Sequence, residues 1–394
     1  MRVLHVIPSA APIDGGPNVA VRALARGLAR RGVDVTVATT NAAGANALDV
    51  PLDEPVIEDG VAYRYFARTV PGTWKFSWPM TRWLWAQAHA YDVVHVHALF
   101  SYATIPGCRA AAHVPVPYVL RPLGTLSEWS LRRRQWKKRP YYALFERSHL
   151  AMASAIHVTS DAEAEDVARL GYADRTRVIP LGVDVDEQAV ARPRSAGGNR
   201  PLRLLFLSRL HEKKNVPLLL RAVAAARPTL RGIELTVAGD GDPAYRAKLD
   251  ALARELGLSE CVRFVGHVDG DAQRSAFADA DCFILPSAHE NFGLAVAEAL
   301  GAGLPAIVTP GVALAPNVAG AGAGLVCQPN EGAVASAIAW AADHPGALIE
   351  MGERARWLAR RELSWDTSCA RLERLYGELA SDVRRGVRRE VRRA

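Results

Sequence analysis

Short apolar runs alternate with segments of helical periodicity along most of the chain. VLHVI (3–7) is followed by NVAVRALARGLARRG (18–32), in which apolar positions recur at intervals of three and four residues. Similar strand-like runs lie further along the first half, namely VDVTVAT (33–39), DVVHVH (92–97), PYVL (117–120) and AIHVTS (155–160). This alternation predicts parallel strands that are connected by helices.

The alternation stops once and then starts again. Residues 185–201 (VDEQAVARPRSAGGNRP) are polar and contain Pro and Gly, which predicts a linker. Beyond it, the strand-like runs are LRLLFLS (202–208), IELTVAG (233–239), VRFVG (262–266), DCFILP (281–286) and PAIVT (305–309). We therefore predict an α/β protein with two Rossmann-like, doubly wound domains, residues 1–185 and 202–364, followed by a C-terminal segment, 365–394.

Composition and charge exclude several classes of protein. The 394 residues carry a net charge of +7, with 49% hydrophobic residues, which is typical of a globular protein. The positive excess is local: LRRRQWKKR (131–139) has six basic groups, and RRGVRREVRRA (384–394) has six Arg and one Glu. The remaining chain is mildly acidic, so we expect no nucleic-acid partner. Trp129 and Trp136 accompany the first basic run, a combination that suits an anionic membrane surface as well as it suits a solvated helix face.

The compartment is predicted from cysteines and apolar segments. The five Cys are scattered with no CxxC spacing, which favours a reducing compartment and gives no indication of a zinc site. The N-terminal apolar run is too short for a secretory signal. The uncharged stretch between Glu298 and Glu331 is interrupted by Pro305, Pro310 and Pro316, so it predicts buried strands rather than a membrane span. We expect a cytoplasmic protein with an optional peripheral contact to the inner face of the membrane.

Two segments at predicted strand ends are suited to phosphate. Gly15 and Gly16, after Asp14, follow the first strand, where glycines allow close backbone approach and a helix N-terminus offers free N–H groups. Arg209 and Lys214 follow the first strand of the second half. Asn215 is the expected cap of the next helix. A guanidinium, an ammonium and a helix N-terminus together suit a diphosphate, although an ordinary turn and a solvated basic loop are the alternatives.

Paired acidic residues lie in SAHENFGLAVAEALGAGLP (287–305). Glu290 lies after a strand and Glu298 within a predicted helix, with a tight Gly turn between them. Eight residues of helix would span about 12 Å, which is the reach from a sugar to the ribose of one nucleotide sugar. A carboxylate accepts two hydrogen bonds, which fits the vicinal diol of a ribose.

Other polar residues have less distinctive settings. His95 and His97 alternate along one strand, but no third ligand is evident from the sequence, so we expect no metal and assign His97 to a polar pocket on the acceptor side. Asp184-Val185-Asp186 and Asp240-Gly241-Asp242 match D-x-D, and we interpret both as turns. Gly239, at the end of a strand, is expected to line the nucleotide pocket.

In combination, these motifs resemble the family 4 retaining glycosyltransferases (glycosyl transferases group 1), which have the GT-B fold. The resemblance rests on Gly15-Gly16, Arg209 and Lys214, and Glu290-x7-Glu298 with Asn291-Phe292-Gly293-Leu294. DVVHVH (92–97), AIHVTSDAEAEDV (155–167), VIPLGVD (178–184) and LSWDTSCARLERLY (363–376) resemble the same family, so the similarity covers nearly the whole chain. This resemblance identifies the family but not the sugar that is transferred.

The resemblance implies roles for these residues. Arg209 and Lys214 would hold the donor diphosphate and stabilise the leaving nucleotide, Glu298 would bind the ribose, and Glu290 would lie by the donor sugar. Backbone N–H groups of Gly16 and of residues 292–294 would complete the cradle. The family is generally metal-independent, so no cofactor is expected beyond the nucleotide-sugar substrate. The helix near 365–381 would return to the first domain, which would bind a sugar or lipid-linked saccharide acceptor used for bacterial surface polysaccharide or glycolipid.

The chain departs from the family at one point. Many members have a His-Gly pair near the donor sugar, where this chain has Leu123-Gly124, and Arg121 is the candidate to replace that His on the acceptor side. Two alternative functions stay open on the sequence. One is a nucleotide-sugar 2-epimerase of the same fold, and the other is a non-catalytic protein that binds a membrane surface.

Overall fold

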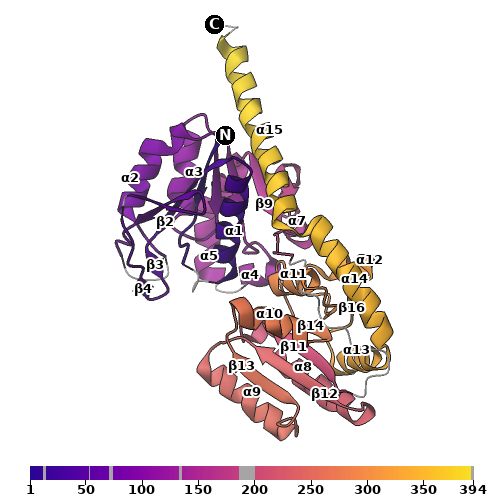
Figure 1. The fold of residues 1–394 in the computed structure, drawn as a ribbon. Coiled ribbons are helices and arrows are strands. Elements are labelled where there is room, and N and C mark those ends of the chain that lie inside the picture. The colour runs from indigo at the N-terminus through magenta and orange to yellow at the C-terminus, as the bar shows by residue number, and fades with distance from the viewer. Residues whose placement is uncertain (12–14, 53, 71–73, 133–134, 186–199, 392–394) are drawn as a thin grey trace. The chain divides into compact units, whose positions relative to one another are not determined.

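A computed structural model describes residues 1–11, 15–52, 54–70, 74–132, 135–185 and 200–391 (Figure 1). The chain divides into two compact units. Unit 1 comprises Met1–Gly182 and Trp365–Ala394, and unit 2 comprises Val183–Ser364. The chain thus leaves unit 1 at Gly182 and re-enters it at Trp365.

Unit 1 is built on an eight-stranded sheet with the order β10-β9-β8-β7-β1-β2-β6-β5. Every described neighbour pair is parallel except β5–β6 at one edge. The strands are β1 (Arg2–Val6), β2 (Asp34–Thr40), β5 (Pro55–Glu58), β6 (Val61–Phe66), β7 (Val93–His97), β8 (Tyr118–Arg121), β9 (Ala155–Val158) and β10 (Thr176–Val178). A separate small hairpin pairs β3 (Ala42–Ala43) with β4 (Asn46–Ala47). The central strands are buried along their length because helices cover both faces, as in doubly wound folds.

The helices of unit 1 begin where the sequence provides a cap or a proline. Ser77 accepts a hydrogen bond from Met80 N, and Ser160 accepts one from Glu163 N, so each serine caps its helix. The helices are α1 (Gly16–Arg30), α2 (Trp78–Gln87), α3 (Thr104–His113), α4 (Glu128–Arg132), α5 (Gln135–Tyr141), α6 (Arg147–Met152), α7 (Asp161–Ala168) and α15 (Trp365–Val391), with a π-helical segment, Tyr142–Glu146, between α5 and α6.

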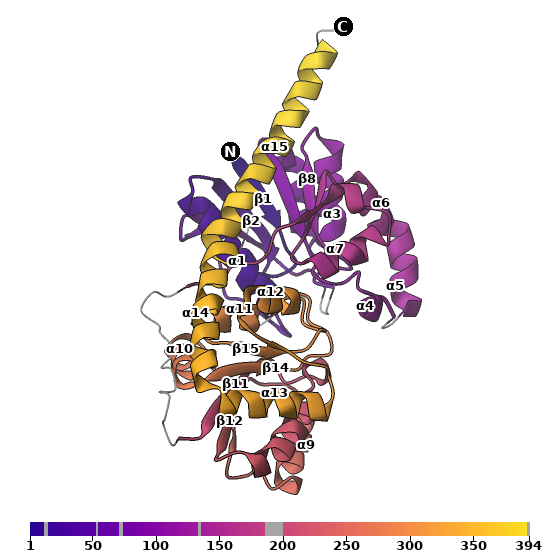
Figure 2. The same cartoon turned by 90° about the vertical axis from the view of Figure 1, so that its right-hand side faces the viewer.

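Helix α15 lies beside α1 in unit 1 (Figure 2). Arg31, just beyond α1, bonds Asp366 at 2.7 Å and Glu373 at 2.8 Å. The Cys369 side chain packs against Gly27, where no larger residue would fit. The helix is longer than the segment 365–381 that the sequence indicated.

Unit 2 contains a six-stranded sheet that is parallel throughout, with the order β13-β12-β11-β14-β15-β16. This order, 3-2-1-4-5-6 in local numbering, is that of the Rossmann fold. Its strands are β11 (Leu202–Leu207), β12 (Ile233–Ala238), β13 (Val262–Gly266), β14 (Cys282–Leu285), β15 (Ala306–Val308) and β16 (Gly324–Val326). Its helices are α8 (Val216–Ala226), α9 (Pro243–Glu255), α10 (Gly270–Asp279), α11 (Leu294–Gly301), α12 (Ala315–Ala321), α13 (Glu331–Asp343) and α14 (Pro345–Glu362).

The predicted fold class is confirmed, because both halves of the chain form parallel, helix-covered sheets. Among the residues that the structure describes, no helix has both the length and the apolar character needed to cross a membrane.

Candidate functional site

The carboxyl ends of β11 and β14 define the candidate site of unit 2. These two strands are neighbours at the centre of the sheet, where the strand order reverses direction. Open α/β sheets bind ligands in the crevice outside such a switch point. The loop after β11 carries Arg209 and Lys214, and the loop after β14 carries Glu290.

Three of the predicted residues come together in these loops. The Lys214 ammonium forms an ion pair with the Glu290 carboxylate, and both side chains are largely buried. Burial, with the nearby charges of Lys213 and Arg209, lowers the pKa of Lys214 to about 8. The positive charge of Lys214 is already partly balanced by the Glu290 carboxylate.

Backbone hydrogen bonds hold Glu290 in place. Its N–H donates to Gly311 O at 2.8 Å, and its own carbonyl accepts from Ala313 N at 3.1 Å. The two loops are also tied to each other, because Ala288 N donates to Lys213 O at 2.8 Å. The Lys214–Glu290 pair thus stands on two loops that are joined through the backbone.

Gly239 lies directly beside the loop that carries Arg209. Its φ is 129°, and a Cβ atom there would collide with the carbonyl oxygen of Ser208. A side chain at this position would push apart the ends of β11 and β12. Next to it, Asp242 caps α9 by accepting from Ala244 N at 2.9 Å and Tyr245 N at 3.0 Å, and Gly241 forms an isolated parallel bridge with Leu210.

The segment from Asn291 to Leu294 forms the turn into α11. Gly293 has φ 94° at the N-cap position, Phe292 is buried, and α11 begins at Leu294. The first N–H groups of this helix have no partner within it, as at any helix N-terminus. The expected cap at Asn215 is wrong in one respect: its side chain makes no capping hydrogen bond, and the residue adopts left-handed backbone angles instead (φ 55°). Asn tolerates these angles better than most residues do.

Glu298 lies within α11 and is separate from the ion pair. Its carboxylate accepts a hydrogen bond from Gln273 Nε2 of α10 at 3.1 Å. Burial raises the pKa of Glu298 to about 7. The hydrogen bond from Gln273 acts to lower this pKa, and the negative charge of Asp184 acts to raise it further. The carboxyl therefore changes charge near neutral pH. Gln273 was not singled out from the sequence, because a glutamine on a polar helix has no distinguishing pattern.

In unit 1, Gly15 and Gly16 lie after β1, one of the two strands at the switch point of that sheet. Gly15 has φ 95° at the N-cap of α1, and a Cβ atom at Gly16 would meet nothing within 4 Å. Asp14 lies outside the described residues, as does Asp186 of the first D-x-D. The participation of Gly15 and Gly16 in donor binding stays a prediction.

The acceptor-side candidates, His97 and Arg121, are buried. They are paired in register at the ends of β7 and β8, with exposed fractions of 0% and 2%. No third ligand for His95 and His97 was evident from the sequence, but the structure brings His5 of β1 beside them. This grouping depends on the register of β1 with β7, which places His5 opposite His95.

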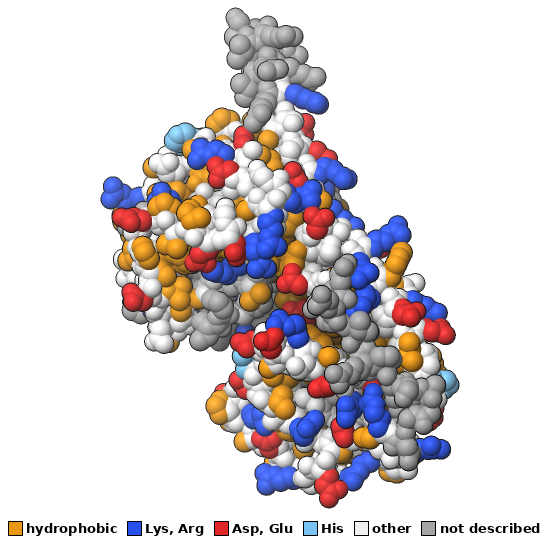
Figure 3. Space-filling model, in the orientation of Figure 1, with side chains coloured by type: hydrophobic (Ala, Val, Ile, Leu, Met, Phe, Trp, Pro, Cys, Tyr) orange, Lys and Arg blue, Asp and Glu red, His pale blue; other side chains and the backbone are white. Residues whose placement is uncertain are grey.

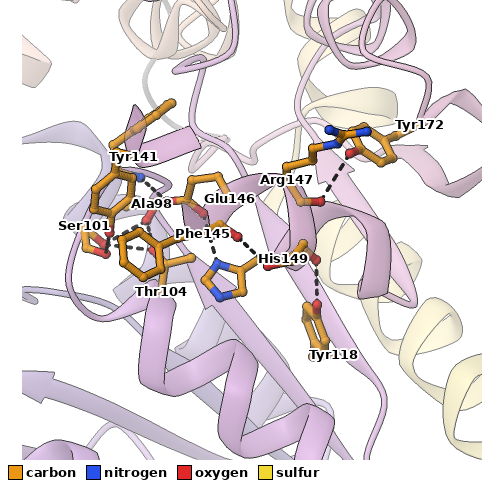
Figure 4. Close-up of polar contacts among 12 residues, drawn as sticks. Ala98, Ser101, Thr104, Tyr118, Tyr141, Phe145, Glu146, Arg147, His149 and Tyr172 are labelled. Atoms are coloured by element: carbon orange, nitrogen blue, oxygen red, sulfur yellow. Dashed lines mark hydrogen bonds and ion pairs between the residues drawn. The ribbon is translucent and has the colours of Figure 1, made fainter. Parts of the chain in front are cut away.

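A buried carboxylate that the sequence did not reveal shapes the loop after β7 (Figure 4). Glu146 is fully buried, accepts a hydrogen bond from Phe100 N at 2.6 Å, and lies 3.2 Å from His149 Nδ1. Within this loop Ala98 and Phe100 have φ of 73° and 57°, which is strained backbone for residues other than Gly. Tyr141 Oη adds a hydrogen bond to Ser101 O at 3.0 Å.

A second buried carboxylate holds the loop after β8. Glu163 accepts from Gly124 N at 2.6 Å and from Thr159 N at 2.8 Å. Leu123, which stands where many relatives have His, has φ 60°. Two glutamates thus fix the strained loops that follow neighbouring strands, where ligands of parallel sheets bind.

The two units, each with its switch-point loops, define a two-domain protein of the GT-B glycosyltransferase class. Residues 15–182 match the glycosyl transferase 4-like domain, and residues 189–357 match the glycosyl transferases group 1 family. D-inositol 3-phosphate glycosyltransferase 2 of Catenulispora acidiphila is 30% identical over 391 residues, which cover 94% of this chain and 91% of that protein.

Two further relatives agree with this assignment. A glycogen synthase of Mycobacterium tuberculosis is 28% identical over 402 residues, covering 95% of this chain and 94% of that one. The crystal structure of Anabaena Alr3699/HepE in complex with UDP and glucose has a TM-score of 0.75 at 20% identity, covering 96% of this chain and 100% of that chain. The chain belongs to the group 1 (family 4) glycosyltransferases of the GT-B fold, and it is a glycosyltransferase enzyme.

Proposed function

We propose that this glycosyltransferase moves a sugar from a nucleotide-sugar donor to an acceptor hydroxyl with retention of configuration, and that unit 2 binds the donor. The observation that carries this proposal is the convergence of Arg209, Lys214 and Glu290 at the β11/β14 switch point. The solved relative with UDP and glucose supports a nucleotide sugar as the donor class.

Lys214 and Arg209 are suited to the diphosphate. An oxyanion that develops on a leaving phosphate is stabilised by fixed cations and by N–H groups aimed at it. Arg209 lies close enough to Lys214 for its charge to lower the pKa of the Lys214 ammonium, so an incoming diphosphate would relieve the repulsion between these two cations. This cluster supports departure of the nucleotide without a metal at the leaving group.

In this proposal Glu290 also binds the donor sugar. In the unliganded chain its carboxylate is held by Lys214. When the diphosphate takes over Lys214, the Glu290 carboxylate becomes available to accept hydrogen bonds from the hydroxyls of the donor sugar. A carboxylate that exchanges one partner for another in this way avoids being left buried without a partner, which would be unfavourable.

Glu298 is proposed to bind the ribose. An ionised carboxylate accepts both hydroxyls of a vicinal diol, and Gln273 orients one of its oxygens. Retention is then explained if the leaving phosphate and the incoming hydroxyl lie on the same side of the sugar. The phosphate accepts the proton of the acceptor hydroxyl while the new glycosidic bond forms and the sugar–phosphate bond breaks.

The acceptor is proposed to bind unit 1 and to be a saccharide, either free or lipid-linked. Exposed aromatic side chains lie next to the basic segment: Trp136 on α5 is 75% exposed, and Trp74 packs edge-on against Tyr141 of the same helix. Basic groups interleaved with Trp favour an anionic bilayer surface. On the face shown in Figure 3, basic and acidic side chains are intermixed over each unit, which supports a local rather than a global attraction.

A screen of nucleotide sugars tests the donor site. We expect one of UDP-, GDP-, ADP- or dTDP-sugars to raise the melting temperature, because a ligand that binds only the folded state stabilises it. Lys214→Ala should abolish the shift and Lys213→Ala, its sequence neighbour, should keep most of it. Loss in both variants or in neither would contradict the proposed site. Mass spectrometry and NMR of the products then separate transfer from epimerisation of the donor alone.

A further inference from the structure

The buried face of the unit 1 sheet carries a cluster of imidazoles that the proposed reaction does not use. His5, His95 and His97 are all fully buried, and one ring nitrogen from each lies within 4.8 Å of the other two. Their ring centroids are 4.1 to 5.2 Å apart. The parallel register of β1 and β7 produces this cluster by placing His5 opposite His95, with His97 on the same face two residues on.

The hydrogen bonding of these rings is incomplete. His5 Nδ1 and His97 Nε2 are 2.9 Å apart and share one hydrogen bond, and His95 Nδ1 is 2.6 Å from Tyr376 Oη. Within the described chain, His5 Nε2, His95 Nε2 and His97 Nδ1 have no hydrogen-bond partner. Buried polar atoms in native proteins are almost always satisfied, so the unpartnered His95 Nε2, beside a His5–His97 pair whose facing nitrogens share one proton, indicates a missing partner.

Burial of all three rings disfavours the imidazolium form, and a neutral imidazole offers a lone pair to a metal ion without first losing a proton. Tyr376 Oη holds His95 Nδ1 in the way that outer hydrogen bonds orient metal-ligating histidines.

We propose that His5, His95 and His97 bind a transition-metal ion of the Zn²⁺ type, in a site independent of the donor site. Imidazole ligands without a carboxylate suit Zn²⁺, Co²⁺, Ni²⁺ and Cu²⁺ and do not suit Mg²⁺ or Ca²⁺. Three protein ligands leave the fourth tetrahedral position open. Two nitrogens bound at about 2.0–2.1 Å in a tetrahedron stand about 3.3 Å apart, so the His5–His97 pair needs to open by only a few tenths of an ångström.

Arg121 decides the nature of the fourth ligand. Arg121 pairs in register with His97 on the adjacent strand, so its guanidinium is close enough to repel a bare dication. An anionic fourth ligand, hydroxide or chloride, removes this repulsion. Arg121 Nε and Nη1 have no hydrogen-bond partner in the described parts of the chain, and they are available to donate to such an anion.

The metal would join three elements of unit 1. His5 belongs to β1, His95 and His97 belong to β7, and Tyr376 belongs to α15. Occupancy would therefore raise the melting temperature of unit 1 through mass action.

The test uses the full chain without an affinity tag, dialysed against a chelator and then titrated with Co²⁺ or Zn²⁺. We expect one ion per chain, the visible absorption bands of tetrahedral Co²⁺, and an X-ray absorption spectrum with imidazole nitrogens at about 2.0–2.1 Å from Zn²⁺. His97→Asn should lose the ion. His267→Asn, which removes an exposed histidine of unit 2 (side chain 70% exposed), should keep it.

A second variant keeps the proposal falsifiable if His97→Asn does not fold. Tyr376→Phe retains all three ligands and removes only the outer hydrogen bond, so it should weaken metal affinity about 10- to 100-fold. The proposal is overturned if the folded chain takes up no Co²⁺ after prolonged equilibration, or if uptake is lost in His267→Asn and kept in Tyr376→Phe at full affinity. None of these readouts involves sugar transfer, so their failure leaves the proposed function untouched.

Discussion

Unit 1 and unit 2 both place polar side chains at the switch point of a parallel sheet, but the two sets differ in charge and exposure. Unit 2 has cations and carboxylates that reach the loops beyond the strands, where Lys214 is paired with Glu290. Unit 1 has neutral imidazoles within its strands, where His5 and His95 stand opposite each other and are fully buried. Position along the strand makes this difference: residues beyond the strand end can meet a charged ligand, whereas burial inside the sheet disfavours the charged form of an imidazole.

The largest expected effect comes from removing a cation in unit 2. Lys214→Ala should reduce kcat for transfer about 10²- to 10³-fold, which is the usual loss when one group that stabilises a developing oxyanion is deleted. Steady-state kinetics with the donor found by the thermal-shift screen measures it. Lys213→Ala is the matched control and should stay within a few-fold of the parent. Equal losses in the two variants would mean that general positive charge, and not the Lys214 position, matters.

The next effect concerns the enclosed groups of unit 1. Tyr376→Phe leaves His95 Nδ1 without its partner and should lower the free energy of unfolding of the chelator-treated protein by about 1–3 kcal/mol. Denaturant unfolding measures it. Tyr65→Phe is the control and should lose less, because among the described residues the hydroxyl of Tyr65 has one hydrogen bond, a long 3.4 Å contact with Arg22. The opposite ranking would remove the case for a specific role of the Tyr376–His95 hydrogen bond.

A smaller effect is the pH dependence of donor binding through Glu298. The pKa of Glu298 is raised to about 7, and the ionised form is the one that we propose accepts the ribose hydroxyls, so affinity should be constant above pH 7. Below pH 7 the Glu298 carboxyl must lose its proton before it can bind the donor, so the donor affinity should fall by up to about tenfold per pH unit. Calorimetry with a nucleotide sugar, whose diphosphate does not titrate in this range, measures the affinity and the proton released. Glu298→Gln should bind weakly with no such slope, and a slope that persists in it would assign the effect elsewhere.

The smallest effect on the fold itself is expected at the exposed surface of unit 1. Trp136→Ala should change the free energy of unfolding by no more than about 0.5 kcal/mol, because the side chain is exposed, yet it should reduce sedimentation with anionic liposomes at low salt. Trp357→Ala is a control in unit 2, where the ring is 55% exposed and lies under Arg361. If the parent chain ignores anionic liposomes, the membrane contact is wrong.

The sequence was sufficient for the parts of the molecule that are local along the chain. Alternating apolar runs predicted both parallel sheets, and Arg209, Lys214 and Glu290 could be identified because each lies in a polar segment after a predicted strand. The hairpin β3–β4 and the edge strands β5, β10 and β16 were not predicted, since short strands at an edge lack a clear apolar pattern. The internal strand β6 (VAYRYF) was also missed, because Arg64 interrupts its apolar run.

Groupings that depend on long-range register were beyond the sequence alone. His5 and His95 are neighbours only because β1 pairs with β7, and Tyr376 reaches them from a helix more than 250 residues further along. Glu146 could not be distinguished from a surface glutamate, because its burial results from how α6 and the preceding π-helical segment pack. Such residues become visible only once the strand order is known.

The path of the chain through unit 1 has a practical consequence for dissecting this enzyme. Because the N-terminal stretch to Gly182 is completed by the final helix, unit 2 is an insertion within unit 1 rather than its successor. Truncation of the protein after Ser364 would remove Cys369 and Tyr376 from an interior that they help to fill. Residues 183–364 can be excised as one continuous piece, whereas the other half can be made only by splicing two distant stretches together.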